Sequence, residues 1–290
     1  MILNAGNILL IGSILLFVSI VVGKAGFRFG VPALLLFLGV GMLFGTDGLG
    51  IEFNNPQTAQ FIGVIALSII LFSGGMDTSA AEIKPVLGQG IVLATVGVMF
   101  TAFLTGYFIY YITNLENSFV TLNFTESLLL ASVMSSTDSA SVFSILRSKR
   151  QGLKENLRPM LELESGSNDP MAYMLTILLI GIIQSGENSL SNTILQFIMQ
   201  MSIGAVSGYL LGRLAVYCIN KLNINQSLYP VLLLAFVFFI FSFTDLVKGN
   251  GYLAVYLAGL VVGNHKVVHK KSLTTFFDGI TWLFQIVMFL

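Results

Sequence analysis

Charged residues are scarce in this chain of 290 residues: they make up 10% of it, whereas 55% are hydrophobic. An ordinary soluble domain contains roughly 25% charged residues, so the composition excludes that class. The single cysteine, Cys218, excludes a disulfide framework and a cysteine-based metal site. No Lys or Arg precedes Lys24, so the first apolar run is predicted to be a retained membrane span and not a cleaved signal peptide. Neither a cofactor nor a nucleic-acid partner is predicted.

The chain has instead a series of long apolar runs. A run of about 20 residues is enough to cross ~30 Å of hydrocarbon as a helix. The predicted spans are 7–23, 31–45, 58–74, 86–112, 126–146, 159–184, 192–219, 227–244, 251–264 and 273–290. The sequence therefore predicts an all-α, multi-pass membrane protein with nine complete crossings and a tenth that reaches the last residue.

Basic residues lie on one side of this predicted topology. With the loops numbered from the N-terminus, 13 of the 14 Lys and Arg residues lie in odd loops or at their membrane edge, and Lys248 is the exception. Arg213 lies in span seven near its odd-loop end, where its side chain can reach the interface. The positive-inside rule assigns the basic side to the cytoplasm. The N-terminus is therefore predicted to lie outside.

Two glycine motifs lie at matching depths in spans of opposite direction. Gly41 and Gly45 lie in span two, and Gly259 and Gly263 lie in span nine. Inverted repeats of this kind are typical of secondary transporters. The alternative is that both motifs serve close helix packing, which is a common use of Gly-x-x-x-Gly. The sequence leaves both readings open.

A run of polar side chains interrupts span five. It extends over 135–139 and contains Thr137 and Asp138. Such side chains compete for backbone hydrogen bonds and weaken a helix, and a broken helix is tolerated in lipid only against protein or a water-filled cavity. Acids within a membrane are costly and usually functional. We therefore predict a discontinuous helix here, with Asp138 in an ion site.

Span six contains a second polar cluster. On a helix, Glu164 and Asn168 share one face, while Ser165 and Asp169 share the adjacent one. Burial and nearby negative charge both favour the neutral form of a carboxyl group. A carboxylate in such a place is expected to hold either a proton or a cation, which is the minimal chemistry of antiport. Glu162 is interpreted as a surface or entry charge.

With these clusters the sequence resembles the monovalent cation:proton antiporter family, in the electroneutral branch that includes the sodium/hydrogen exchangers. Within that branch it is most similar to the bacterial potassium/proton, or cell-volume-regulation, subgroup. The resemblance covers nearly the whole chain. It rests on the segments 41–48, 71–76, 136–138, 162–172 and 277–279.

The resemblance implies roles for individual residues. Asp169 is implied to be the essential carboxylate that binds the ion and the proton, and Asn168 beside it implies a 1:1 electroneutral exchange. The cation shell is implied to be completed or supported by Thr137, Asp138, Glu164 and Ser165. Asp169 and Asp138 are thus the expected ligands of the transported K⁺ or Na⁺.

The resemblance also implies an architecture that the chain does not complete. The family has about thirteen spans, a second broken helix and a late arginine, none of which precedes Leu290. We therefore expect 1–290 to be an exchanger-type transmembrane domain that is incomplete at its C-terminus, with a first repeat over about 1–184 and a second from about 227. The 290-residue chain alone is not expected to transport ions. A homodimer in the bacterial inner membrane is expected by resemblance.

Potassium and sodium are not separated by the sequence. The pair Ser139-Ala140 stands where sodium-selective members have Pro-Val, which favours the potassium type, but a Na⁺-selective antiporter stays an alternative. A cation channel is a further alternative, because broken helices and carboxylates also serve conduction. An intramembrane protease is disfavoured, since its Tyr-Asp, Gly-x-Gly-Asp and Gly-x-Ser-Gly motifs are missing. The protein is thus not expected to be an enzyme.

Overall fold

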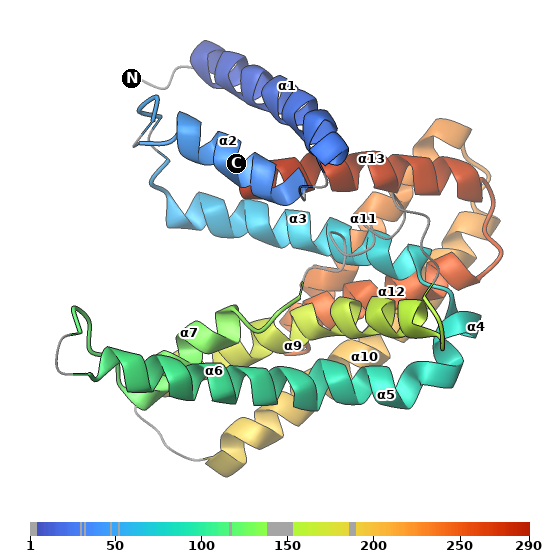
Figure 1. Cartoon of the computed structure of the whole chain (residues 1–290). Helices are drawn as coiled ribbons and strands as arrows, with labels where there is room; N and C mark the ends of the chain where they lie inside the picture. The colour runs from blue at the N-terminus through green and yellow to red at the C-terminus, as the bar shows by residue number, and fades with distance from the viewer. Residues whose placement is uncertain are drawn as a thin grey trace. The chain divides into compact units, whose positions relative to one another are not determined.

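Apolar segments in lipid form helices because a helix satisfies its own backbone N–H and C=O groups. The computed structural model of the chain follows this rule, and every secondary-structure element that it describes is helical (Figure 1). The structure describes residues 5–29, 31, 33–46, 48–51, 53–115, 118–137, 153–185 and 190–290.

The helices follow the predicted apolar runs. The first three are α1 (Ala5–Phe29), α2 (Ala33–Phe44) and α3 (Pro56–Asp77). The fourth run is built from α4 (Ala80–Ile83), the 3-10 turn η1 (Lys84–Val86), α5 (Leu87–Val92), the π-helical turn η2 (Leu93–Gly97) and α6 (Val98–Thr113). The remaining elements are α7 (Phe124–Val133), α9 (Leu157–Ser185), α10 (Leu190–Lys221), η3 (Gln226–Leu228), α11 (Tyr229–Leu246), α12 (Gly251–Asn264) and α13 (Lys270–Phe289).

Eight of the predicted spans each overlap one of these helices, and the span 251–264 matches α12 at both ends. The span 86–112 is divided among η1, α5, η2 and α6, and α7 covers only the first part of the span 126–146, of which 138–146 lie outside the described residues. Among the described residues, seven helices are long and apolar enough to cross a membrane. Three further apolar helices, α2, α7 and α12, are shorter. The prediction of an all-α multi-pass membrane protein is confirmed, and the count of ten crossings stays a prediction.

The chain divides into two compact units. The smaller unit comprises Met1–Ile70, Ala140–Gly152 and Lys271–Leu290, and the larger unit comprises Leu71–Ser139 and Leu153–Lys270. The smaller unit thus contains α1, α2 and most of α3 and α13. The larger unit contains the last turns of α3 and the helices from α4 to α12, so that spans eight and nine group with spans five and six.

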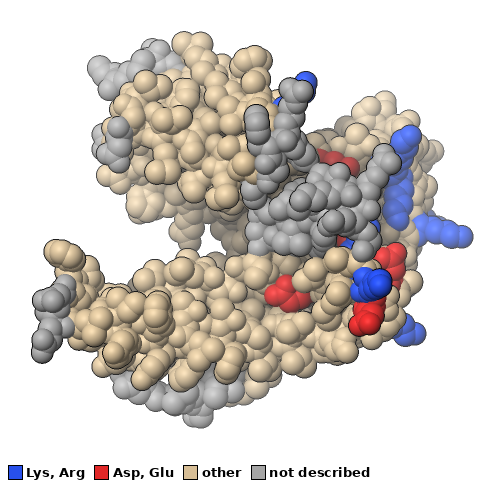
Figure 2. Space-filling model, in the orientation of Figure 1, with Lys and Arg blue, Asp and Glu red and all other residues tan. Residues whose placement is uncertain are grey.

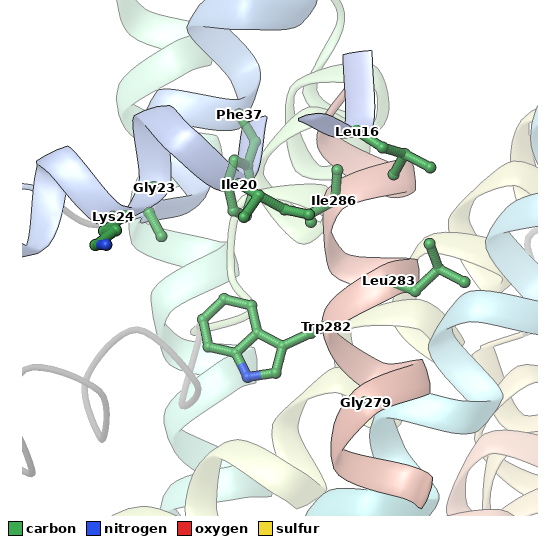
Figure 3. A pocket seen from close by; sticks show the side chains of 10 residues that line it. Leu16, Ile20, Gly23, Lys24, Phe37, Gly279, Trp282, Leu283 and Ile286 are labelled. Atoms are coloured by element: carbon green, nitrogen blue, oxygen red, sulfur yellow. The ribbon is translucent and has the colours of Figure 1, made fainter. Parts of the chain in front are cut away.

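The smaller unit has an apolar core and an apolar cavity. Leu34 and Phe37 of α2 pack against Ile286 of α13. Beside this core lies a cavity of about 540 Å³ between α1, α2 and α13, with Trp282 at its edge (Figure 3). Among the described residues that line it, Lys24 alone is charged. An apolar lining offers no ligands for a cation, so the ion site must be sought in the larger unit.

Glycines bring three helices of the larger unit into close contact. On α10, β-carbons at Gly204, Gly208 and Gly212 would lie within 3 Å of residues of the α12 segment. On α12, β-carbons at Gly259 and Gly263 would clash with backbone carbonyls at the end of α3. Small residues allow this backbone-to-backbone packing. Close packing therefore explains the glycine motif of span nine, whereas the inverted repeat stays a prediction.

Three odd-numbered loops meet at one end of the larger unit. Asn264 Nδ2 donates to the carbonyl of Thr78 (2.8 Å), and Asn220 Nδ2 donates to the carbonyl of Lys266 (2.9 Å). Arg213 Nη1 lies 3.0 Å from His265 Nε2 at the same end. Three of the five loops that were predicted to share one side of the membrane therefore lie together in this unit, and the orientation of that side stays a prediction.

The surface has the apolar character that lipid requires. Along α6 the large side chains Phe100, Phe103, Tyr107 and Phe108 are all more than half exposed. In Figure 2, the body formed by α5 to α7 is largely free of charge, and charged side chains gather toward its α4 end. A soluble protein rarely exposes so large an apolar surface, which agrees with insertion in a bilayer.

Candidate ion-binding site

The helix α7 begins with a strong cap and ends early. Asn123 Oδ1 accepts from the backbone N–H of Glu126, and the Glu126 carboxylate accepts from the N–H of Asn123. At the other end, the Ser135 hydroxyl donates to the carbonyl of Ser132 (2.7 Å). This side-chain bond competes with the regular helical ladder, and the helix stops at Val133. The helix thus ends where the polar run was predicted to interrupt span five, and the remainder of that span lies outside the described residues.

The segment after this break packs against the middle of α9. Ser165 Oγ donates to the backbone carbonyl of Thr137 (2.7 Å). The hydroxyl of Thr137 lies 3.3 Å from Glu164 Oε2 and 3.3 Å from Ser165 Oγ. Two regions that are 27 or more residues apart in the sequence therefore form one polar cluster. Glu164 and Ser165, which belong to the two adjacent faces predicted for this helix, both take part in it.

Asn168 lies at the centre of this cluster. Its side chain is completely buried. Its Nδ2 donates to Glu164 Oε1 (2.9 Å) and to the hydroxyl of Thr137. Its Oδ1 has no hydrogen-bond partner among the described residues. An unpaired buried acceptor costs about 1–3 kcal/mol, so this oxygen is a candidate ligand for a cation.

Asp169 occupies the adjacent face of α9. Its Oδ1 accepts a hydrogen bond from the hydroxyl of Ser136, the residue before Thr137. The side chain is partly buried, near the middle of a helix that is long enough to span a membrane. The structure therefore brings together five of the six predicted site residues: Thr137, Glu164, Ser165, Asn168 and Asp169. The sixth, Asp138, follows Thr137 directly and lies outside the described residues.

Glu162 lies apart from the cluster. Its carboxylate pairs with the guanidinium of Arg158, one turn earlier on α9 (Nε to Oε1, 3.0 Å). Arg158 is more than half exposed, whereas the Glu162 side chain is 11% exposed. This geometry agrees with its interpretation as a charge outside the ion site.

The cluster offers oxygen atoms of several kinds. Two carboxylates, hydroxyl groups, the Asn168 carbonyl oxygen and the backbone carbonyl of Thr137 lie along the contact between α9 and the segment after α7. Oxygen ligands of this type can replace the hydration shell of an alkali cation. Over the described ranges there is no group of three or more His, Cys, Asp or Glu residues that could hold a metal ion.

The sequence did not single out Ser136 or Asn250. Ser136 was part of the polar run, but its position within that run gave no sign that it would contact Asp169. Asn250 precedes α12, and its Nδ2 donates to the carbonyl of Pro170, the residue after Asp169 (3.3 Å). The sequence signal was limited to an asparagine before an apolar run, which is typical of a helix N-cap.

The sequence and the fold of this chain are similar to those of known proteins. The family described as "Sodium/hydrogen exchanger, transmembrane" matches residues 12–290. The chain belongs to the sodium/hydrogen exchanger family. The resemblance to this family that was noted in the sequence is thus confirmed.

Named relatives of this exchanger chain extend well beyond it. It is 42% identical to the K(+)/H(+) antiporter NhaP of Alkalimonas amylolytica over 285 residues, which cover 98% of this chain and 48% of the relative. It is 37% identical to the K(+)/H(+) antiporter NhaP2 of Shewanella sp. (strain ANA-3) over 290 residues, which cover 99% of this chain and 49% of the relative. The chain thus spans about half the length of these curated relatives.

A solved structure shares the exchanger fold. The sodium proton antiporter MjNhaP1 from Methanocaldococcus jannaschii at pH 8 matches with a TM-score of 0.78. The match has 20% sequence identity and covers 99% of this chain and 72% of that chain. At this identity the likeness shows the fold, and the predicted all-α membrane fold is confirmed.

Proposed function

We propose that the protein carrying this chain exchanges a monovalent cation, K⁺ or Na⁺, for H⁺ across a membrane, with binding centred on Asp169. The observation that carries this proposal is the buried Asn168, which joins Thr137 and Glu164 beside Asp169. This arrangement holds two carboxylates and several neutral oxygen atoms together where α7 breaks. Ion pathways are typical of such intramembrane carboxylates.

Competition at one site gives the coupling. A carboxylate that holds a proton has no charge to attract a cation, and a carboxylate that ligates a cation is harder to protonate because the bound positive charge stabilises its ionised form. One proton and one monovalent cation each neutralise one negative charge. The neutral Asn168 beside Asp169 therefore supports a 1:1 electroneutral exchange, in which inward proton movement drives cation export.

The proposed cation shell consists of Asp169, Glu164, the Asn168 carbonyl oxygen, Ser165 and Thr137, with Asp138 as a further ligand. The relatives at 42% and 37% identity are named as K(+)/H(+) antiporters, which supports K⁺ as the transported ion. A Na⁺-selective exchanger is the alternative, because selectivity among alkali cations depends on fine cavity geometry and field strength.

Transport is proposed to proceed by alternating access, in which α7 and α9 move relative to a scaffold. The protein is further proposed to lie in the bacterial inner membrane as a homodimer, with the N-terminus outside. The placement of basic residues supports this orientation. Ion, pH and volume homeostasis would be its physiological role.

The test is cation-dependent proton movement in everted vesicles that contain the full-length protein. Addition of K⁺ or Na⁺ to vesicles with an acid interior should restore the fluorescence of a pH-sensitive dye. The variant Asp169→Asn should abolish this response, because it removes the titratable group. Glu162→Gln is a matched control on the same helix, since its carboxylate pairs with Arg158 and lies outside the cluster. Retained activity in Asp169→Asn would refute the assignment.

The same vesicles separate exchange from conduction. A 1:1 exchanger should move protons equally well when a permeant anion such as thiocyanate collapses the membrane potential, because no net charge moves. A channel should instead produce a potential that depends on the cation gradient, without obligatory proton movement. A panel of K⁺, Na⁺, Li⁺ and Rb⁺ in this assay determines the transported ion.

A further inference from the structure

Asn250 makes contacts with three helices. Its backbone N–H donates to the carbonyl of Gln200 on α10 (2.9 Å). Its Oδ1 accepts from the N–H of Leu253 (3.0 Å) and so caps the N-terminus of α12. Its Nδ2 donates to the carbonyl of Pro170 on α9 (3.3 Å) and lies 3.8 Å from Met201 Sδ. The residue is 3% exposed, so these bonds are shielded from water.

The backbone around Asn250 is held firmly in place. The preceding turn ends α11 with Lys248 in the left-handed region (φ 62°) and with a bond from Gly249 N–H to the carbonyl of Thr244 (2.8 Å). A β-carbon on Gly204 of α10 would lie 2.7 Å from the carbonyl oxygen of Asn250. The turn is therefore packed directly on the α10 backbone, and the α10–α12 pair forms a rigid support for the Asn250 side chain.

The part of α9 that Asn250 contacts is weakly held by its own helix. Pro170 lies inside α9 and has no N–H, so it leaves the carbonyl of Gly166 without the donor that a regular helix provides. Asn168 and Asp169 lie in this same turn. Helices bend most easily at such a proline. An external bond to the Pro170 carbonyl therefore acts on the backbone that positions the site carboxylate.

We propose that Asn250 is a positioning residue of the ion site: its Nδ2 group fixes the Asp169–Pro170 step of α9 against the N-terminus of α12. The inference rests on the proposed function of Asp169 as the ion-binding group. Loss of the Nδ2 bond lets this turn of α9 relax, so the cation shell loses its geometry while the fold remains.

The two functions of the side chain can be separated by substitution. Serine caps a helix about as well as asparagine but has no group that reaches the Pro170 carbonyl, so Asn250→Ser keeps the cap and removes the link to α9. Asn250→Ala removes both. Asn225→Ser is the matched control, because Asn225 also caps a helical turn through its Oδ1 (3.2 Å to Ser227 N) and is exposed.

The experiment measures cation affinity from the thermal shift that K⁺ or Na⁺ produces in the purified protein, together with the pH profile of exchange. In Asn250→Ser the midpoint without cation should stay within about 2 °C of wild type. The cation dissociation constant should rise about three- to tenfold, the factor that one neutral hydrogen bond supplies. The pH profile should shift, and Asn225→Ser should leave both readouts unchanged.

Two results would overturn the inference. The first is a wild-type affinity and pH profile in Asn250→Ser. The second is a loss of affinity in Asn250→Ala alone, because the cap would then be responsible. If Asn250→Ser does not assemble, Asn250→Thr, which also keeps a capping hydroxyl, is judged by the same criteria. Wild-type protein that binds cation but moves no protons would instead refute the proposed antiport and leave the role of Asn250 intact.

Discussion

Asn168 donates a hydrogen bond to the carboxylate of Glu164, one turn earlier on α9, at 2.9 Å. The same amide group also donates to the hydroxyl of Thr137, beyond the end of α7. One neutral side chain thus holds an acid of α9 and a residue of the broken helix in fixed positions. Both donor positions of the amide are used, which leaves its oxygen for another partner.

The first prediction concerns the charge of Glu164. Glu164→Gln preserves the size of the side chain and an oxygen that can accept from Asn168, but it removes a negative charge from the cation shell. We expect the apparent KM for the cation to rise about tenfold, which corresponds to ~1.4 kcal/mol, while exchange remains measurable at saturating cation. The dye assay over a series of cation concentrations measures this change. An unchanged KM would exclude Glu164 from the site.

The second prediction concerns the hydroxyl of Ser136. Ser136→Ala removes the hydrogen bond to Asp169, and its loss should weaken cation binding by about ten- to a hundredfold, since a hydrogen bond to a charged group contributes about 1.5–3 kcal/mol. Thermal shift with K⁺ and Na⁺ is the measurement. Ser132→Ala is the control, because the Ser132 hydroxyl contacts Thr176 (3.0 Å) and no acid. Equal effects of the two variants would contradict the assignment of Ser136.

The third prediction concerns the contact between α10 and α12. In Gly208→Ala the new β-carbon would lie 2.5 Å from the carbonyl oxygen of Ala254 and 2.7 Å from its Cα. Backbone atoms cannot yield as a flexible side chain does, so we expect a loss of about 1–3 kcal/mol in stability, seen as a lower thermal midpoint of the purified protein. Gly88→Ala, where nothing lies within 4 Å, should leave the midpoint unchanged. A wild-type midpoint in Gly208→Ala would show that the two helices are less closely packed.

The fourth prediction concerns orientation. In a variant whose native cysteine is removed by Cys218→Ser, the substitution Lys248→Cys introduces a single cysteine. This cysteine should react with a membrane-impermeant thiol reagent added outside intact cells. A single cysteine at Asn223, in the loop after α10, should react only in everted vesicles. Basic loops are retained in the cytoplasm. Asn223 lies in an odd-numbered loop, which is predicted to be cytoplasmic, and Lys248 lies in an even-numbered loop, which is predicted to be outside. Labelling with the opposite pattern would reverse the proposed topology.

The membrane class and the positions of the helices followed from the sequence because lipid imposes a simple rule. A segment without charges must be helical to satisfy its backbone in hydrocarbon. The apolar run 251–264 therefore predicted both the first and the last residue of α12. The break after Val133 was also predictable, since adjacent serines and threonines compete for backbone carbonyls. Likewise, the spacing of Glu164, Ser165, Asn168 and Asp169 places them on two adjacent faces of one helix.

Contacts between distant segments depended on the tertiary structure. Spacing placed Asn168 near Glu164, but no local pattern indicated that Thr137 would accept from Asn168, or that Ser136 and not a neighbouring serine would meet Asp169. The glycines of α10 did not indicate that α12 is the helix they contact, because a small residue permits a close approach without specifying which element approaches. Asn250 could be recognised as a cap from its place before α12, whereas its bond to Pro170 arises from the packing of α9, α10 and α12. The sequence by itself determined which segments are helices and which polar residues interrupt them, since both depend on local composition, and the tertiary structure decided which of these groups meet.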